Sequence, residues 1–237
     1  MAMAIPEILV VGDSVFKGVI FDTARQRYAL LKECAATLLA GKLPIVNRSQ
    51  MGRTAPQGLR MLKDQPPEEL RGRIVVLEFG GNDCDFDWAE VAEHPELPHE
   101  PHTPAGAFVE ALGQMVSYVR QCGGRPILST LPPLDCQRYL SWITRNGLSR
   151  ERILQFIGVP ERIYRWQEYY SALVLHVAAS LKCEYVPVRE AFLEQVRGED
   201  VLCVDGIHPN AAGQRIIADA ASKYARQLLL KKALARL

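Results

Sequence analysis

Near the amino terminus the chain reads Ile8-Leu9-Val10-Val11-Gly12-Asp13-Ser14, a short apolar run that ends in a glycine and two small polar residues. Four apolar residues without interruption are typical of a strand that is buried on both faces, as in a parallel sheet. A second run of this kind, Ile74-Val75-Val76-Leu77, leads into Phe79-Gly80-Gly81. The two runs predict two buried parallel strands, each followed by a loop that contains glycine.

Segments with helical patterns alternate with these strands. We expect helices over 23–40, 55–62, 160–181, 210–237 and after Thr103-Pro104, and further strands over 44–46, 126–131 and 184–187. Such alternation predicts right-handed crossovers and a parallel sheet covered by helices on both faces. We therefore expect an α/β fold in one domain, residues 1–237, with its ligand crevice beyond the carboxyl ends of the strands.

Two connections, 84–103 and 132–159, are longer than the usual loops of α/β proteins. Both follow the ends of predicted strands. They are candidates for the walls of a binding site, and the alternative is that they are unpatterned surface insertions.

The composition excludes several classes of protein. The 237 residues include 28 Lys+Arg and 27 Asp+Glu, which gives a net charge of +1 and disfavours nucleic-acid binding. The first eleven residues lack a basic region and a long apolar core, and no membrane span is expected. The six cysteines are scattered without a C-x-x-C pair. These features favour a cytoplasmic protein.

Three short segments carry the residue types of a serine hydrolase. They are Gly12-Asp13-Ser14 after the first strand, Gly80-Gly81-Asn82-Asp83 after the 74–77 strand, and Asp205-Gly206-Ile207-His208-Pro209 before the last helix. A serine hydroxyl needs a base to remove its proton, and His208 has a carboxylate three residues away that can fix its tautomer. The amide of Asn82 and the backbone N–H of Gly52 can donate to the oxyanion of a tetrahedral intermediate.

On these residues the sequence resembles the SGNH (GDSL) hydrolases, whose four conserved blocks occur here in order between residues 12 and 210. Ser14 matches the first block, Gly52 in Gly52-Arg53-Thr54 the second, Asn82 the third and His208 the last. Val15 stands where the family's other name has leucine. The resemblance implies a flavodoxin-like three-layer α/β/α fold, a Ser14, His208 and Asp205 triad, and an oxyanion hole formed by Ser14, Gly52 and Asn82. It implies neither a metal nor a cofactor.

The expected function is hydrolysis of a small or medium acyl ester, with an acetylated carbohydrate as one option. Four aromatic residues are candidates for substrate contacts: Phe16, Phe86, Trp88 and Trp142. Two alternatives stay open at this point. The same triad could transfer the acyl group to an alcohol, or the fold could be a non-catalytic module that binds a phosphate or nucleotide.

Two other groups of residues have simpler interpretations. His94, His99 and His102 alternate with prolines in a segment without helical spacing, so we expect no metal site there. The aromatic residues over 164–170 could mark a subunit contact, and the sequence leaves the oligomeric state open.

Overall fold

The computed structural model describes residues 6–41, 43–195 and 200–234, with residues 228–234 described as backbone only. Its centre is a five-stranded sheet in the order β4-β1-β5-β6-β7, and every neighbouring pair is parallel. The strands are β1 (Ile8–Gly12), β4 (Ile45–Asn47), β5 (Ile74–Glu78), β6 (Arg125–Ser129) and β7 (Glu184–Val186). Counted along the chain within this sheet alone, the order is 2-1-3-4-5, which is that of flavodoxin-like sheets. The prediction of a parallel α/β sheet is confirmed.

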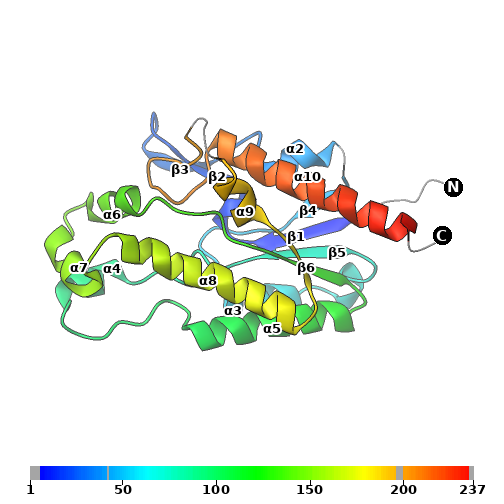
Figure 1. The fold of residues 1–237 in the computed structure, drawn as a ribbon, viewed down its shortest axis with the longest axis horizontal. Coiled ribbons are helices and arrows are strands. Elements are labelled where there is room, and N and C mark those ends of the chain that lie inside the picture. Colours follow the sequence, from blue (N-terminus) through cyan, green and yellow to red (C-terminus); the bar gives the residue numbers. More distant parts are fainter. Residues whose placement is uncertain (1–5, 42, 196–199, 235–237) are drawn as a thin grey trace.

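Helices cover both faces of the sheet, as Figure 1 shows. Side chains alternate along β1, so Leu9 and Val11 belong to one apolar cluster and Ile8 and Val10 to the other. The first cluster packs under α3 (Ala55–Lys63), α5 (Ala105–Gln121) and α8 (Glu161–Ser180). The second packs under α2 (Ala35–Ala40), α9 (Val188–Leu193) and α10 (Ala211–Leu234). The result is three layers with the sheet in the middle. Two short elements complete this framework, α1 (Ser14–Lys17) and a 3-10 turn at Pro67–Glu69.

The predicted helix over 23–40 is wrong in its first half. The chain there forms an antiparallel hairpin of β2 (Val19–Asp22) and β3 (Arg27–Leu30), and only α2 remains helical. Asp22 Oδ1 accepts the backbone N–H groups of Ala24 and Arg25, and Gln26 has a φ of 51°, a turn that no α-helix contains. Helix-forming residue types are overridden here by tertiary contacts, since Phe21 and Tyr28 pack their rings against Trp142.

The two long connections are not unpatterned. They contain α4 (Trp88–Glu93), α6 (Cys136–Thr144) and α7 (Arg150–Ile157). We call these three helices the cap. They share an apolar cluster with the first turn of α8, and the fully buried members of this cluster are Val91, Leu140 and Ile153. The cap follows the carboxyl ends of β5 and β6, and in Figure 1 it lies at the end of the molecule away from the two termini. The insertions therefore form a small packed unit beside the place where a ligand crevice is expected.

Within the described ranges, none of the helices combines the length and the apolar character that crossing a membrane requires.

Candidate active site

Ser14 lies at the carboxyl end of β1, where the chain turns into α1. Asp13 Oδ1 accepts the N–H of Val15 at 2.9 Å and so caps this short helix. A side chain at Gly12 would come within 2.8 Å of the carbonyl oxygen of Glu78 on the neighbouring strand, so the turn requires glycine at that position. These local constraints fix the Ser14 side chain, which is 7% exposed.

His208 and Asp205 meet Ser14 from the loop before α10. His208 Nε2 lies 2.9 Å from Ser14 Oγ, and His208 Nδ1 lies 2.7 Å from Asp205 Oδ2. Asp205 Oδ1 also accepts the backbone N–H groups of Ile207 and His208 at 3.1 Å each. The turn from Asp205 to His208 thus holds the carboxylate against His208 Nδ1, and His208 Nε2 faces Ser14.

The charge on Asp205 is stabilised by this arrangement. Burial alone would raise the pKa of Asp205, but the hydrogen bonds and charge of His208 and the two backbone N–H groups lower it below its usual range. Asp205 is fully buried and ionised beside the imidazole. An imidazolium formed at His208 would therefore be stabilised by a fixed negative charge.

Tyr28 is a residue of this site that the sequence analysis missed. Its ring packs on His208, with centroids 5.1 Å apart, and it reaches there from β3 of the hairpin. Burial and the charge of Asp205 raise the pKa of Tyr28 to about 12, so its hydroxyl stays neutral. The segment Arg27-Tyr28-Ala29-Leu30 has no alternation of polar and apolar residues, so the sequence offers no signal that could have placed Tyr28 here.

Asn82 and Gly52 approach Ser14 from two further loops. Asn82 Nδ2 lies 2.9 Å from Asp13 Oδ2 and 3.1 Å from the carbonyl oxygen of Arg53. Gly52 has a φ of 74° and lines the same cavity as Ser14 and Asn82. The structure therefore brings together all five residues that the sequence analysis assigned to the triad and the oxyanion hole.

Three buried carboxyl groups stand behind these loops: Asp13, Glu78 and Asp83. Glu78 Oε2 accepts the backbone N–H of Asp13 at 3.3 Å. Burial and the neighbouring charge of Asp13 raise the pKa of Glu78 well above its usual range. Burial also raises the pKa of Asp13, whose Oδ2 accepts a hydrogen bond from the Asn82 amide.

Asp83 braces the loop that carries Asn82. Its Oδ1 accepts the N–H of Ala55 at the start of α3 at 2.8 Å, and its carbonyl oxygen accepts the N–H of Thr103. His102 Nδ1 lies 3.1 Å from the carbonyl oxygen of Asn82. The loop is thus fixed from α3 on one side and from the segment before α5 on the other.

The buried Asp83 predicts a measurable dependence of stability on pH. Burial raises its pKa to about 6 from a usual 3.8, so the folded state binds a proton more tightly than the unfolded state. The free energy of unfolding should therefore fall as pH rises from about 4 to about 6, by about 3 kcal/mol from this group. In Asp83→Asn the amide oxygen can still accept the Ala55 N–H, and this decrease should vanish. Urea denaturation of both proteins across this range measures the difference, and equal pH dependence in the two would contradict the assignment.

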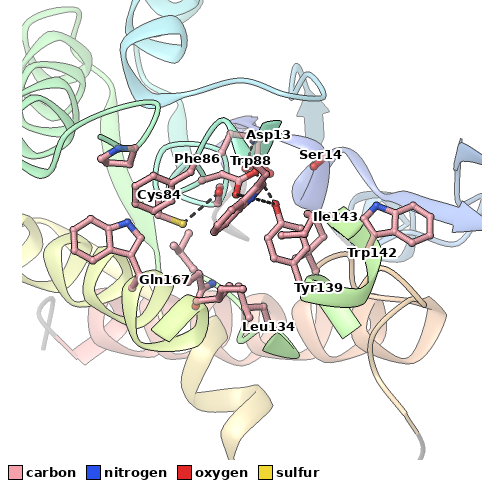
Figure 2. Close-up of a pocket in the computed structure, with 18 of the residues that line it drawn as sticks. Asp13, Ser14, Cys84, Phe86, Trp88, Leu134, Tyr139, Trp142, Ile143 and Gln167 are labelled. Carbon is pink, nitrogen blue, oxygen red and sulfur yellow. Dashed lines mark hydrogen bonds between the residues drawn. The ribbon is translucent and has the colours of Figure 1, made fainter. Parts of the chain in front are cut away.

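A large cavity opens beside Ser14, with a volume of about 680 Å³. Figure 2 shows Phe86, Trp88 and Tyr139 pointing into it, with Trp142 on the other side of Ser14. Of the four predicted aromatic contacts, Phe86, Trp88 and Trp142 line this cavity. They come from the cap or from the loop that leads into it.

Phe16 lies elsewhere. The turn of α1 directs its side chain to the second apolar cluster, where it packs with residues of the sheet and of α2 and α10. Phe16 is therefore corrected from a substrate contact to a partly buried residue packed against the second apolar cluster.

The aromatic residues over 164–170 do not form one surface patch. Tyr170 is fully buried and donates its hydroxyl to the carbonyl oxygen of Thr103, and Trp166 lines the cavity beside Ser14. Tyr164 is half-buried, and Tyr169 is exposed, at 44%. A subunit contact through this segment stays a prediction.

Chemically, the arrangement can activate a nucleophile. The imidazole can take the hydroxyl proton of Ser14 as the oxygen attacks a carbonyl carbon, and Asp205 then balances the charge. In the part of the chain that the structure describes, no three His, Cys, Asp or Glu side chains gather in a way that could hold a metal ion.

Comparison with known proteins places the chain among similar sequences and folds. The model of the GDSL-like Lipase/Acylhydrolase family matches residues 10–216. A comparison with curated proteins gives no match.

Several solved structures are similar over nearly the whole chain. One is a variant of Axe2, an acetyl-xylooligosaccharide esterase from Geobacillus stearothermophilus, with a TM-score of 0.65, 17% identity, and coverage of 93% of this chain and 94% of that chain. LAE5, an alpha/beta hydrolase enzyme from the metagenome of Lake Arreo, Spain, has a TM-score of 0.62 and 19% identity, with coverage of 93% of this chain and 94% of that chain. A member of the lipolytic protein G-D-S-L family from Veillonella parvula has a TM-score of 0.61 and 13% identity, with coverage of 92% of this chain and 97% of that chain. At these identities the similarity shows the fold.

Proposed function

The chain belongs to the GDSL-like lipase/acylhydrolase family, and from this we propose that it cleaves a small or medium acyl ester through an acyl-enzyme on Ser14. Membership makes the protein a carboxylic ester hydrolase, and the resemblance to SGNH hydrolases is confirmed together with their three-layer fold. The observation that carries the proposal is the line of contacts from Ser14 Oγ to His208 Nε2 at 2.9 Å and from His208 Nδ1 to Asp205 at 2.7 Å.

In the proposed reaction the Ser14 oxygen attacks the ester carbonyl carbon while His208 Nε2 takes the hydroxyl proton. The tetrahedral intermediate collapses, the bond to the alcohol oxygen breaks, and His208 gives the proton to that oxygen. In the second half, His208 Nε2 removes a proton from a water molecule whose oxygen attacks the acyl carbon. The bond to Ser14 Oγ then breaks, the acid leaves, and His208 returns the proton to Ser14 Oγ. Asp205 stays ionised throughout and orients the imidazole.

The oxyanion would be bound by the N–H groups of Ser14 and Gly52 and by the Asn82 amide. One Asn82 N–H is held by Asp13, which fixes the direction of the amide. The other N–H points to the carbonyl oxygen of Arg53 at 3.1 Å, and we propose that the oxyanion takes over this donor as it forms. Hydrogen bonds of this kind commonly tighten only when substrate is bound.

Replacement of Asn82 by alanine should lower kcat by roughly 100-fold to 1,000-fold, the usual cost of one oxyanion donor. KM should change much less, because the donor acts on charge that develops in the transition state. Steady-state kinetics on a nitrophenyl ester measure the split. A variant that loses affinity at unchanged kcat would show that Asn82 binds the ground state instead.

Hydrolysis and acyl transfer use the same acyl-enzyme and differ in the acceptor. Product analysis in the presence of competing alcohols separates them, because a transferase forms a new ester and a hydrolase forms mainly the free acid. The phosphate-binding alternative would explain neither Asp205 beside His208 nor the family to which the chain belongs.

The proposed function is tested with nitrophenyl acetate, butyrate and octanoate as substrates for the wild-type protein. Turnover that saturates with substrate and is lost after Ser14 replacement supports the proposal. Turnover that persists without Ser14 contradicts it.

A further inference from the structure

We propose that the cavity on the Trp88 and Phe86 side of Ser14 binds a linear acyl chain of about eight to twelve carbons. This inference rests on the proposed function, since the triad defines which part of the ester lies where. It names the acyl part of the substrate, which neither the family match nor the similar structures specify.

The direction of the ester follows from the chemistry of His208. The imidazole must give its proton to the leaving alcohol oxygen, so the alcohol lies on the His208 side of Ser14. On that side stand Tyr28, which packs on the His208 ring, and Trp142, which is 6.2 Å from Tyr28 between ring centroids. The acyl group must therefore extend to the opposite side, toward Trp88, Phe86 and Cys84 in Figure 2.

The acyl side of the cavity is lined by apolar and aromatic side chains. Phe86 is the centre of this group, with its ring 5.5 Å from Trp88, 5.7 Å from Phe156 and 6.0 Å from Trp166 between centroids. Leu134 lines the same cavity. Such a surface offers dispersion and desolvation energy to an alkyl chain along its length.

Two polar side chains that line the cavity, Asp85 and Gln167, are already paired with the protein. Asp85 accepts the Trp88 indole N–H at 2.8 Å with one oxygen and the Tyr139 hydroxyl at 2.7 Å with the other. Gln167 donates to the carbonyl oxygen of Pro132 at 2.7 Å and accepts from Arg189 at 3.0 Å. These groups stiffen the walls and leave their aromatic faces to the ligand.

One donor is different, because the Trp166 indole N–H is buried and has no hydrogen-bond partner among the described residues. A sugar carries several hydroxyl groups, and each needs a partner when it is buried. A single indole N–H cannot satisfy them, and the other polar side chains of the cavity include His99, Glu100 and Arg162. The part of the cavity around Phe86 is walled by aromatic rings and therefore fits an alkyl chain better than a carbohydrate ring.

The size of the cavity sets the length of the chain. A methylene group takes about the space of one water molecule, roughly 30 Å³, so a chain of about ten carbons needs roughly 300 Å³. The whole cavity, at about 680 Å³, holds such a chain and leaves room for the alcohol. An acetyl group would leave nearly all of this space to water. The cap, which supplies most of the aromatic walls, thereby gains a role in selecting chain length.

The first test measures kcat/KM on nitrophenyl esters from acetate to dodecanoate, each below its aggregation concentration. Burying a methylene should raise kcat/KM about fourfold until the chain fills the cavity, so decanoate should exceed acetate by at least about 100-fold. A flat or falling profile, with acetate hydrolysis that depends on Ser14, would overturn the acyl assignment and leave the proposed function intact.

The second test narrows the cavity. Leu134→Trp should lower the decanoate to acetate ratio of kcat/KM at least about tenfold, and Leu134→Phe should lower it less. The matched control is Leu193→Trp, because Leu193 is 55% exposed on α9 and does not line the cavity. Its ratio should equal that of the wild type. A ratio uses one protein for both substrates, so a partly unfolded variant does not imitate the effect, and an unchanged ratio in Leu134→Trp would overturn the proposal.

The third test does not depend on turnover. Decanoic acid should raise the thermal midpoint of Ser14→Ala, and xylo-oligosaccharide at the same concentration should not. If the wild type hydrolyses no ester and decanoic acid still binds, the cavity assignment is supported and the proposed function fails. Stabilisation by the sugar alone would overturn the acyl assignment.

Discussion

Ser14→Ala should lose turnover of every ester by on the order of a millionfold, because the oxygen that forms the acyl-enzyme is absent. The residual rate would come from substrate binding and from the oxyanion donors, which remain in place. The fold should be unaffected, because Asp13 still caps α1 and because, among the described residues, the Ser14 hydroxyl hydrogen-bonds to His208 alone. Rates and thermal midpoints of the two proteins measure both statements.

A matched control is available in Ser180→Ala. Ser180 is exposed at the end of α8, so its replacement removes a hydroxyl group without touching the cavity. This variant should keep the wild-type rate and midpoint. A loss in Ser14→Ala of less than about tenfold would show that another group forms the covalent intermediate or that none forms.

Asp205→Asn should lower kcat by about 10,000-fold while Ser14 and His208 stay in place. The carboxylate accepts a hydrogen bond from His208 Nδ1 at 2.7 Å and so keeps the lone pair on Nε2 toward Ser14. An amide at this position can donate to Nδ1 instead, which favours the wrong tautomer and removes the charge that stabilises the imidazolium. KM should change little. Steady-state kinetics at neutral pH measure the effect.

The control for this variant is Asp219→Asn, which removes an exposed carboxylate on α10 and should leave the rate unchanged. Asp13 is the next residue in sequence to Ser14, and its carboxylate is occupied by the N–H of Val15 and the Asn82 amide. If Asp205→Asn keeps more than a tenth of the wild-type kcat, Asp205 does not orient the base.

The centre of the sheet could be predicted from the sequence because β1 and β5 are short apolar runs, such as Ile8 to Val11, which are typical of strands buried on both faces. The hairpin over 19–30 could not. Its residues suit a helix, and the contact that selects the hairpin is with Trp142, more than a hundred positions further along the chain. Local pattern therefore failed where a distant side chain decides the structure.

The same distinction holds within the site. Asp205 and His208 are three residues apart, so their contact follows from a single turn and is visible in the sequence. Glu78 contacts Asp13, and Tyr28 contacts His208. The order of these residues along the chain reveals neither contact. Phe16 was misplaced because proximity in sequence to Ser14 says nothing about which face of α1 it occupies.

The cap shows a third limit. Its helices α4, α6 and α7 are short, and their apolar residues face one another instead of the sheet. Each one is too short for its periodic pattern to stand out in the sequence, and together they form a cluster that exists only after the two insertions meet. The cavity walls therefore follow from tertiary structure.

The most direct measurement of the central claim is the mass of the protein after reaction with a fluorophosphonate, which traps a nucleophilic serine. The mechanism predicts one adduct per chain, located by peptide mapping at Ser14 and absent from Ser14→Ala. An adduct at another residue, or an active enzyme that acquires none at Ser14, would contradict it.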